Sequence, residues 1–233
     1  SDLGIHEGLV QSWKDIFPKK GEIHFAGALE NNEDTGTLQY LASTAMEAGF
    51  STRVLDMQAL DLQNGRFFDP AGELVNRCFK LYPWEWMVDE SPDGCLAEME
   101  WLEPIWKLVM SNKAILATLY ELFPDSPYVL PCYLSRPRSG LFCKKPVFSR
   151  EGHNVSVVDI RDWEEYVRIA ETEGDYNTGA YVYQEYVEPT AYSGRYPVIG
   201  SWIIGGEAAG IGIRENRMEV TDNLSEFVPH IIG

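Results

Sequence analysis

The sequence predicts a mixed fold, in which an α/β segment is followed by an α+β segment. In the first half, two strand-like apolar stretches flank a segment with helical spacing of its leucines and alanines. In the second half, short strand-like stretches separated by turns replace that alternation. We therefore expect a partial, doubly wound strand–helix–strand domain at residues 1–108 and an α+β domain with antiparallel sheets at 109–233.

The first half contains the elements of a parallel α/β unit. A helix is expected at 1–21, and an amphipathic helix at 37–48, where apolar residues recur every three to four positions after a loop at 30–36. An acidic surface loop is expected at 89–99, and a short hairpin at 64–70. Strands are expected at residues 23–29, 52–57 and 78–82.

The second half begins with a helix at 112–122, which Ser111 is expected to cap and Pro124 ends. The turn at Gly205 and Gly206 is expected to join two strands as an antiparallel hairpin. Strands are expected at residues 142–147, 155–158, 180–187, 198–204 and 210–215.

The composition limits the classes of partner. The chain has 19 basic and 36 acidic residues and a net charge of −17, which disfavours binding to nucleic acid. That charge suits a cationic substrate such as a polyamine, although solubility alone also explains it. No apolar run is long enough for a membrane span and no signal pattern opens the chain, so we expect a cytoplasmic protein with no membrane partner.

Cysteines and histidines show no metal-binding or redox spacing. There is no CxxC pair and no HExxH motif, so no metal ligand is assigned within the chain. The four cysteines are expected to be reduced thiols. They are Cys78, Cys95, Cys132 and Cys143.

Two neighbouring segments carry possible phosphate chemistry. Strand alternation places Lys145 on the same face as Cys143 and Val147, where an inward lysine needs an anionic partner. An edge lysine whose ammonium reaches solvent is the alternative. The turn at 149–154 contains Gly152 and can offer backbone N–H groups to phosphates, but taken alone the motif fits an ordinary hairpin turn better.

Two later strands suit a nucleotide cleft. In residues 209–214, Gly210, Gly212 and Arg214 share one face, and glycines within a strand often mark close approach of a ligand or backbone. Arg214 could hold phosphate charge, or form a surface salt bridge instead. Residues 183–187 form a strand whose backbone could meet an adenine edge.

Taken together, several segments resemble the C-terminal part of the glutathionylspermidine synthase family, and most closely its stand-alone bacterial synthase-like members. The similarity covers about residues 22–232 and keeps the order and spacing of the family motifs. The segments are 33–40 (EDTGTLQY), 80–85 (KLYPWE), 103–116, 145–154 (KPVFSREGHN), 184–187 (QEYV), 199–202 (IGSW), 210–215 (GIGIRE) and 227–230 (FVPH).

The resemblance implies an ATP-grasp fold and an ATP-dependent carboxylate–amine ligase. Such enzymes use ATP and Mg2+ to activate an acid as an acyl phosphate, from which an amine then displaces phosphate. In this family the acid is the glycine carboxylate of glutathione and the amine is spermidine. The partners expected here are therefore glutathione or another peptide as the acid and a polyamine-like amine. The expected activity is therefore formation of an amide bond.

The resemblance also assigns roles to individual residues. Arg214 corresponds to the arginine that stabilises the transferring phosphoryl group. Glu33, Asp34 and Glu226 correspond to acidic positions near the amine substrate. The ATP-contacting positions fall on Lys113, Lys145, Glu151, Gly152, Gln184, Glu185, Tyr186, Val187, Glu219, Val220 and Thr221.

The chain also departs from the family pattern. The polyamine-contacting threonines fall on Leu81 and Trp86, and a glutamine near the nucleotide falls on Val198. The glutathione-binding arginine and the Mg2+ ligands are expected upstream of this chain, which is therefore expected to be part of a longer enzyme. The alternative is a catalytically incomplete ATP-binding module with a regulatory or assembly role.

Overall fold

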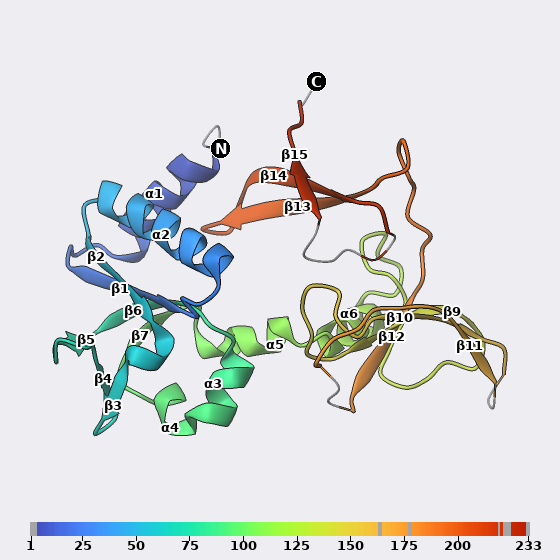
Figure 1. Cartoon of the computed structure of the whole chain (residues 1–233), viewed down its shortest axis with the longest axis horizontal. Helices are drawn as coiled ribbons and strands as arrows, with labels where there is room; N and C mark the ends of the chain where they lie inside the picture. Colours follow the sequence, from blue (N-terminus) through green and yellow to red (C-terminus); the bar gives the residue numbers. More distant parts are fainter. Residues whose placement is uncertain (1–3, 163–164, 177–178, 219, 221–224, 232–233) are drawn as a thin grey trace. The chain divides into compact units, whose positions relative to one another are not determined.

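The computed structural model describes residues 4–162, 165–176, 179–218, 220 and 225–231 of the chain (Figure 1). The chain forms two compact units. The first comprises Ser1–Leu108 with Ser201–Gly210, and the second comprises Val109–Gly200 with Ile211–Gly233. Residues 201–210, which the sequence predicts within the second domain, thus pack with the first. None of the described helices is both long and apolar enough to cross a membrane.

A four-stranded parallel sheet forms the centre of the first unit, in the order β2-β1-β6-β7. Its strands are β1 (Glu22–Gly27), β2 (Ser51–Asp56), β6 (Arg77–Leu81) and β7 (Glu100–Leu102). The long helix α2 (Asn32–Glu47) connects β1 to β2, as the sequence predicts for a strand–helix–strand unit. The parallel strand–helix–strand unit is the part of the predicted doubly wound domain that the structure confirms.

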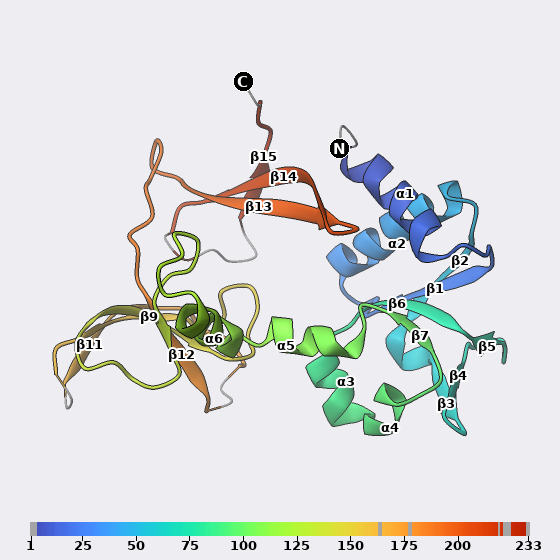
Figure 2. The ribbon, with the colours of Figure 1, turned by 180° about the vertical axis from the view of Figure 1, so that it is seen from behind.

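Different elements pack against the two faces of this sheet. Helix α1 (Ile5–Ile16) and α2 lie together on one side, where Trp13, Phe25 and Leu38 belong to one apolar core (Figures 1 and 2). The second core joins the other face to a small antiparallel sheet and to short helices. These are β3 (Asp61–Gln63), β4 (Arg66–Phe68), β5 (Leu74–Val75), α3 (Trp84–Glu90), α4 (Pro92–Cys95) and the 3-10 turns at Met57–Ala59 and Ile105–Lys107.

Helix α2 begins five residues before the predicted start at 37, so the expected loop at 30–36 is largely helical. The side chain of Asn31 accepts hydrogen bonds from the backbone N–H groups of Glu33 and Asp34, which caps the helix at this earlier position. The two acidic residues then lie in the first turn, where the helix dipole favours negative charge. The segment 89–99, also expected to be a loop, contains the end of α3 and all of α4.

A five-stranded antiparallel sheet forms the centre of the second unit, in the order β11-β10-β9-β12-β8. Its strands are β8 (Cys132–Tyr133), β9 (Gly140–Pro146), β10 (Ser156–Ile160), β11 (Tyr166–Glu171) and β12 (Tyr181–Glu185). Helix α6 (Ala114–Leu122), which follows α5 (Leu108–Ser111), packs on β8 and β12. The N-cap residue of α6 is Lys113 rather than the predicted Ser111, and the side chain of Asn112 accepts a hydrogen bond from the N–H of Ala114.

A second antiparallel sheet has the order β13-β14-β15. It consists of β13 (Tyr196–Ile204), β14 (Glu207–Asn216) and β15 (Glu226–Val228), and the predicted turn at Gly205 and Gly206 joins the first two. A Cβ on Gly210 would lie 3.1 Å from Cγ1 of Ile5 in α1. The close approach that this glycine permits is therefore to a side chain of the protein itself.

Candidate functional site

The two lysines predicted to contact phosphate are positioned by the end of β9. Lys145 lies on β9, and its Nζ donates a hydrogen bond of 2.7 Å to Oε1 of Gln184 on β12. Lys113 precedes α6, and its backbone N–H donates to Val147 O at 2.8 Å, just past the end of β9. The partner of Lys145 is therefore a neutral amide, where the sequence predicts an anion. Its ammonium charge is not neutralised by that contact.

Hydrogen bonds hold the loop at 149–154 at both ends, to Lys113 and to Thr172, which follows β11 (Tyr166–Glu171). Nζ of Lys113 donates to the backbone carbonyl of Ser149 and, at 3.0 Å, to its Oγ. At the other end, the hydroxyl of Thr172 donates to the carbonyl of Gly152. Glu151 and Gly152 adopt left-handed backbone conformations, with φ of 56° and 72°. Only Gly152 does so without steric cost, which explains the glycine at this turn.

The same loop forms one wall of a cavity of about 660 Å³. This volume is in the range of sites for small molecules, roughly 300–1,000 Å³. The cavity is mixed in charge, with Arg217 and three glutamates on its walls. Its lining residues are Glu151, Gly152, His153, Ile169, Ala170, Glu171, Thr172, Glu173, Tyr196, Arg217, Met218 and Val220.

The structure thus brings several predicted ATP-contacting residues to one region of the second unit. Glu151, Gly152 and Val220 line the cavity, and Lys113 holds the loop that forms its wall. Glu219 and Thr221, predicted beside Val220, lie outside the described residues. Sequence reasoning missed Arg217 and Thr172, because neither belongs to a motif and both reach the loop only through the fold.

The strand predicted to meet adenine uses part of its backbone within the protein. The N–H of Glu185 donates to Pro131 O at 2.8 Å, and the N–H of Tyr186 donates to Leu141 O at 3.0 Å. Val187 is 59% exposed. A base at this strand would therefore not be recognised through those two N–H groups, which are bonded within the protein.

The remaining predicted residues are not brought into the cavity wall. Arg214 lies on β14 with its guanidinium carbon 5.8 Å from the ring centre of Phe227. Glu226 forms an ion pair of 3.2 Å with Arg195. Glu33 and Asp34 belong to the other unit, in the first turn of α2. Within the described residues, no group of three His, Cys, Asp or Glu side chains is placed to hold a metal ion.

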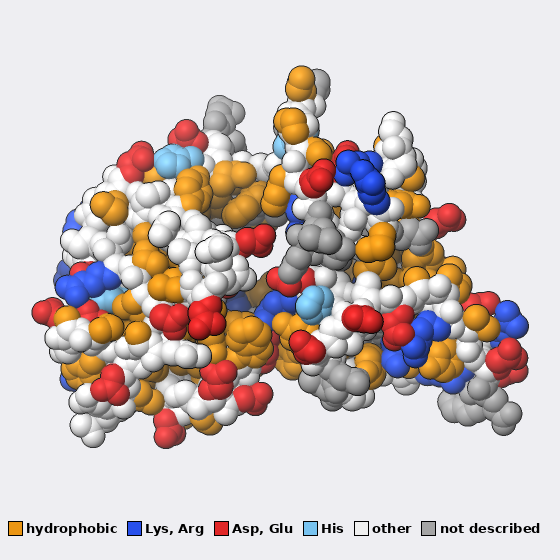
Figure 3. Space-filling model, in the orientation of Figure 1, with side chains coloured by type: hydrophobic (Ala, Val, Ile, Leu, Met, Phe, Trp, Pro, Cys, Tyr) orange, Lys and Arg blue, Asp and Glu red, His pale blue; other side chains and the backbone are white. Residues whose placement is uncertain are grey.

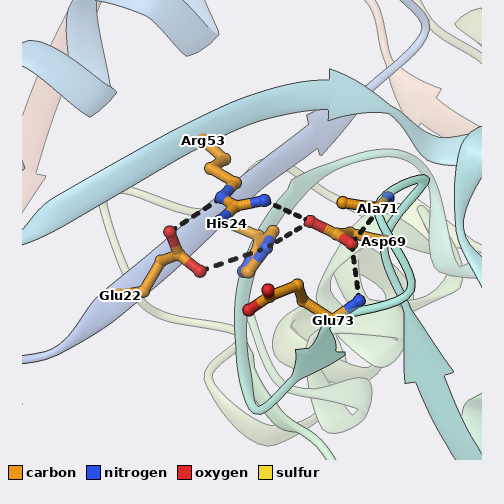
Figure 4. Close-up of polar contacts among 6 residues, drawn as sticks. All are labelled: Glu22, His24, Arg53, Asp69, Ala71 and Glu73. Carbon is orange, nitrogen blue, oxygen red and sulfur yellow. Dashed lines mark hydrogen bonds and ion pairs between the residues drawn. The ribbon is translucent and has the colours of Figure 1, made fainter.

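The first unit contains a buried polar cluster that the sequence did not indicate (Figure 4). His24 on β1 is only 2% exposed, and neither ring nitrogen has a hydrogen-bond partner. Arg53 on β2 bonds Glu22 at 2.8 Å and Asp69 at 2.6 Å, and these two carboxylates lie 3.7 and 3.9 Å from Nε2 of His24. Asp69 also accepts from the backbone N–H groups of Ala71 and Glu73, which lowers its pKa.

His24 should make the stability of the protein pH-dependent. Burial lowers its pKa from 6.5, and this effect exceeds the opposite effect of Glu22 and Asp69. Since the folded state then binds the proton less readily than the unfolded state, stability is present above pH 6.5 and is lost as the pH falls below it. We expect His24→Leu to flatten this dependence in urea unfolding between about pH 7.5 and 5.5.

Comparison with solved structures gives the general class of fold. A putative γ-glutamylcysteine synthetase from Methylobacillus flagellatus KT has a TM-score of 0.61 over 95% of this chain and 72% of that chain, at 9% identity. The two therefore share a fold of mixed parallel and antiparallel sheets. A profile described as glutathionylspermidine synthase preATP-grasp matches residues 3–233. The chain belongs to the glutathionylspermidine synthase family.

Two curated relatives agree with this assignment. The putative acid–amine ligase of Haemophilus influenzae is 34% identical over 97% of this chain and 61% of its own length. The trypanothione synthetase of Crithidia fasciculata is 28% identical over 97% of this chain and 38% of its own length. The chain therefore spans between about two fifths and three fifths of these relatives.

Proposed function

We propose that this chain is the ATP-binding part of an ATP-dependent acid–amine ligase with an ATP-grasp fold, in which residues 1–108 precede the nucleotide-binding domain at 109–233. Family membership and the names of the relatives support the reaction class. The single observation that supports ATP as the ligand is the loop at 149–154. It is held by Lys113, follows the strand that carries Lys145, and forms one wall of the large cavity.

In the proposed reaction, a carboxylate oxygen attacks the terminal phosphorus of ATP, and ADP leaves. The amine nitrogen then attacks the acyl carbon, phosphate leaves, and the nitrogen loses a proton. The chain's own part is to position the phosphates: Lys145 supplies an ammonium charge, and the backbone of the loop at Gly152 covers them. Arg214 would stabilise the transferring group if β14 brings it to the phosphates.

Among the described residues, no group of three acidic, histidine or cysteine side chains is placed to hold the Mg2+ that the family implies. We therefore assign no metal ligand in this chain, and the proposal contains no step at a metal. The acids Glu33, Asp34 and Glu226 remain proposed contacts of the amine.

The reaction is tested by ATP-dependent release of phosphate with panels of peptide acids and of amines, with the amide product identified by mass spectrometry. The proposal expects a product that requires all three substrates. ATP binding without any amide product would instead support the alternative, an ATP-binding module. Absence of ATP binding, measured as no shift in the thermal unfolding of the chain, would contradict both.

A further inference from the structure

A second, smaller cavity lies in the first unit, at the carboxyl edge of the parallel sheet. Met57 and Gln58 line it directly after β2, and Tyr82 lines it directly after β6. Helix α3 and the small sheet complete the wall with Met87, Glu90 and Phe67, among others. In open α/β sheets, ligands bind at the carboxyl ends of the strands. The position of this cavity is therefore that of a ligand site.

The interior of this cavity is lined mainly by apolar side chains, and one side is open to solvent. Phe67 and Met87 are 4% and 2% exposed, and Leu60 and Leu62 extend the apolar wall. The volume is about 170 Å³. A cavity of about 150 Å³ with apolar walls accommodates one benzene molecule. The space therefore suits a single aryl ring or a short branched alkyl group.

A carboxylate lies at the exposed side of the cavity. The hydroxyl of Tyr82 donates to Oε2 of Glu90 at 2.5 Å, which fixes the orientation of that carboxylate. Burial, followed by Glu90 and then Asp56, raises the pKa of Tyr82 to about 12, so the phenol stays protonated and remains the donor to Glu90. A carboxylate has about four acceptor sites, so Glu90 can also accept from an ammonium group.

We propose that this cavity binds a primary amine that carries one aryl or short alkyl group, with its ammonium at Glu90 and its apolar group between Phe67 and Met87. The cavity does not include Glu33, Asp34 or Glu226, so this amine site is proposed in addition to the contacts of the ligase's acceptor amine. A polyamine fits poorly, because its second ammonium would be buried against apolar side chains without a partner. Trp86 packs edge-on against Tyr82 of the cavity wall, with the ring centres 5.4 Å apart.

The methionines of the chain provide a direct test. Met57 and Met87 line the cavity, and the other four methionines do not. We expect titration of the full chain with benzylamine, without ATP, to shift the 13C-methyl NMR signals of Met57 and Met87 only. Toluene, the uncharged probe of the same size, should bind more weakly. Equal binding of toluene, or stronger shifts with spermidine than with benzylamine, would overturn the proposed ligand class.

Two variants, each with a control, test separately the charge of Glu90 and the volume of the cavity. Glu90→Gln should weaken benzylamine binding about threefold, as expected for an ion pair near solvent, and Asp89→Asn, at the neighbouring exposed acid, should not. Leu62→Phe should fill the cavity and abolish the shifts, whereas Leu74→Phe, at the exposed position of β5, should leave them. If Glu90→Gln binds benzylamine as the wild type does, the carboxylate has no role and the proposal fails.

This experiment is independent of the ligase test. Benzylamine binding is measured without ATP or an acid, so it can succeed in a chain that forms no amide. Benzylamine that shifts none of the six methionine signals, or shifts all of them alike, would remove the amine site and leave the proposed ATP site intact.

Discussion

Lys145→Met is expected to weaken ATP binding by about 10- to 150-fold, because a hydrogen bond between an ammonium and a phosphate contributes roughly 1.5–3 kcal/mol. In the unliganded chain the ammonium is bonded only to the neutral amide of Gln184 among the contacts described. Its charge is therefore available to an anion, and the methionine keeps most of the apolar stem. Isothermal titration of ATP into both proteins measures the difference.

Lys144→Met is the matched control for this prediction. Lys144 is the adjacent residue on β9 and points to the opposite face, where its Nζ lies 4.0 Å from the ring centre of Tyr181. It has the same charge, so a general electrostatic effect would weaken ATP binding in both variants alike. Equal losses in the two variants would contradict a specific contact with Lys145.

The largest expected change in stability comes from Phe25→Ala in the first unit. Phe25 is fully buried on β1, and its ring packs edge-on against Trp13 at 5.6 Å. Removing a buried phenylalanine ring leaves a cavity and costs about 3–5 kcal/mol. We expect a loss of that size in the free energy of unfolding, measured by urea titration followed by circular dichroism.

Met46→Ala provides the comparison within the same unit. Met46 lies on α2 with 61% of its surface exposed, so its truncation should change stability by no more than about 0.5 kcal/mol. If Phe25→Ala also costs less than about 1 kcal/mol, Phe25 does not belong to a tightly packed core.

Apolar periodicity predicted those elements that have one buried face, and failed where no such face exists. It found α2 from Leu38 onward, but missed the first turn, which is held by the side chain of Asn31 and has no apolar residue. It also missed β11, an edge strand whose residues are almost all exposed, so that no alternation marks it. Short edge elements of this kind depend on backbone pairing, which composition does not reveal.

The candidate sites were harder still to predict from the sequence, because they form through contacts between residues that are far apart in the chain. The motif around Lys145 was visible in the sequence, but its bond to Gln184 joins positions 39 residues apart. The cluster at His24 joins two parallel strands to the turn at Asp69, and spacing along the chain gave no sign of it. The small cavity likewise forms from four elements, each of which appears as ordinary core in the sequence.

Hydrogen–deuterium exchange in the presence of ATP tests the central claim most directly. The account predicts that ATP slows amide exchange in the loop at 149–154 and in the strand at 184–187, and that Lys145→Met removes this protection. Protection confined to the first unit, or the absence of any ATP-dependent change in those two segments, would contradict the assignment of the nucleotide site.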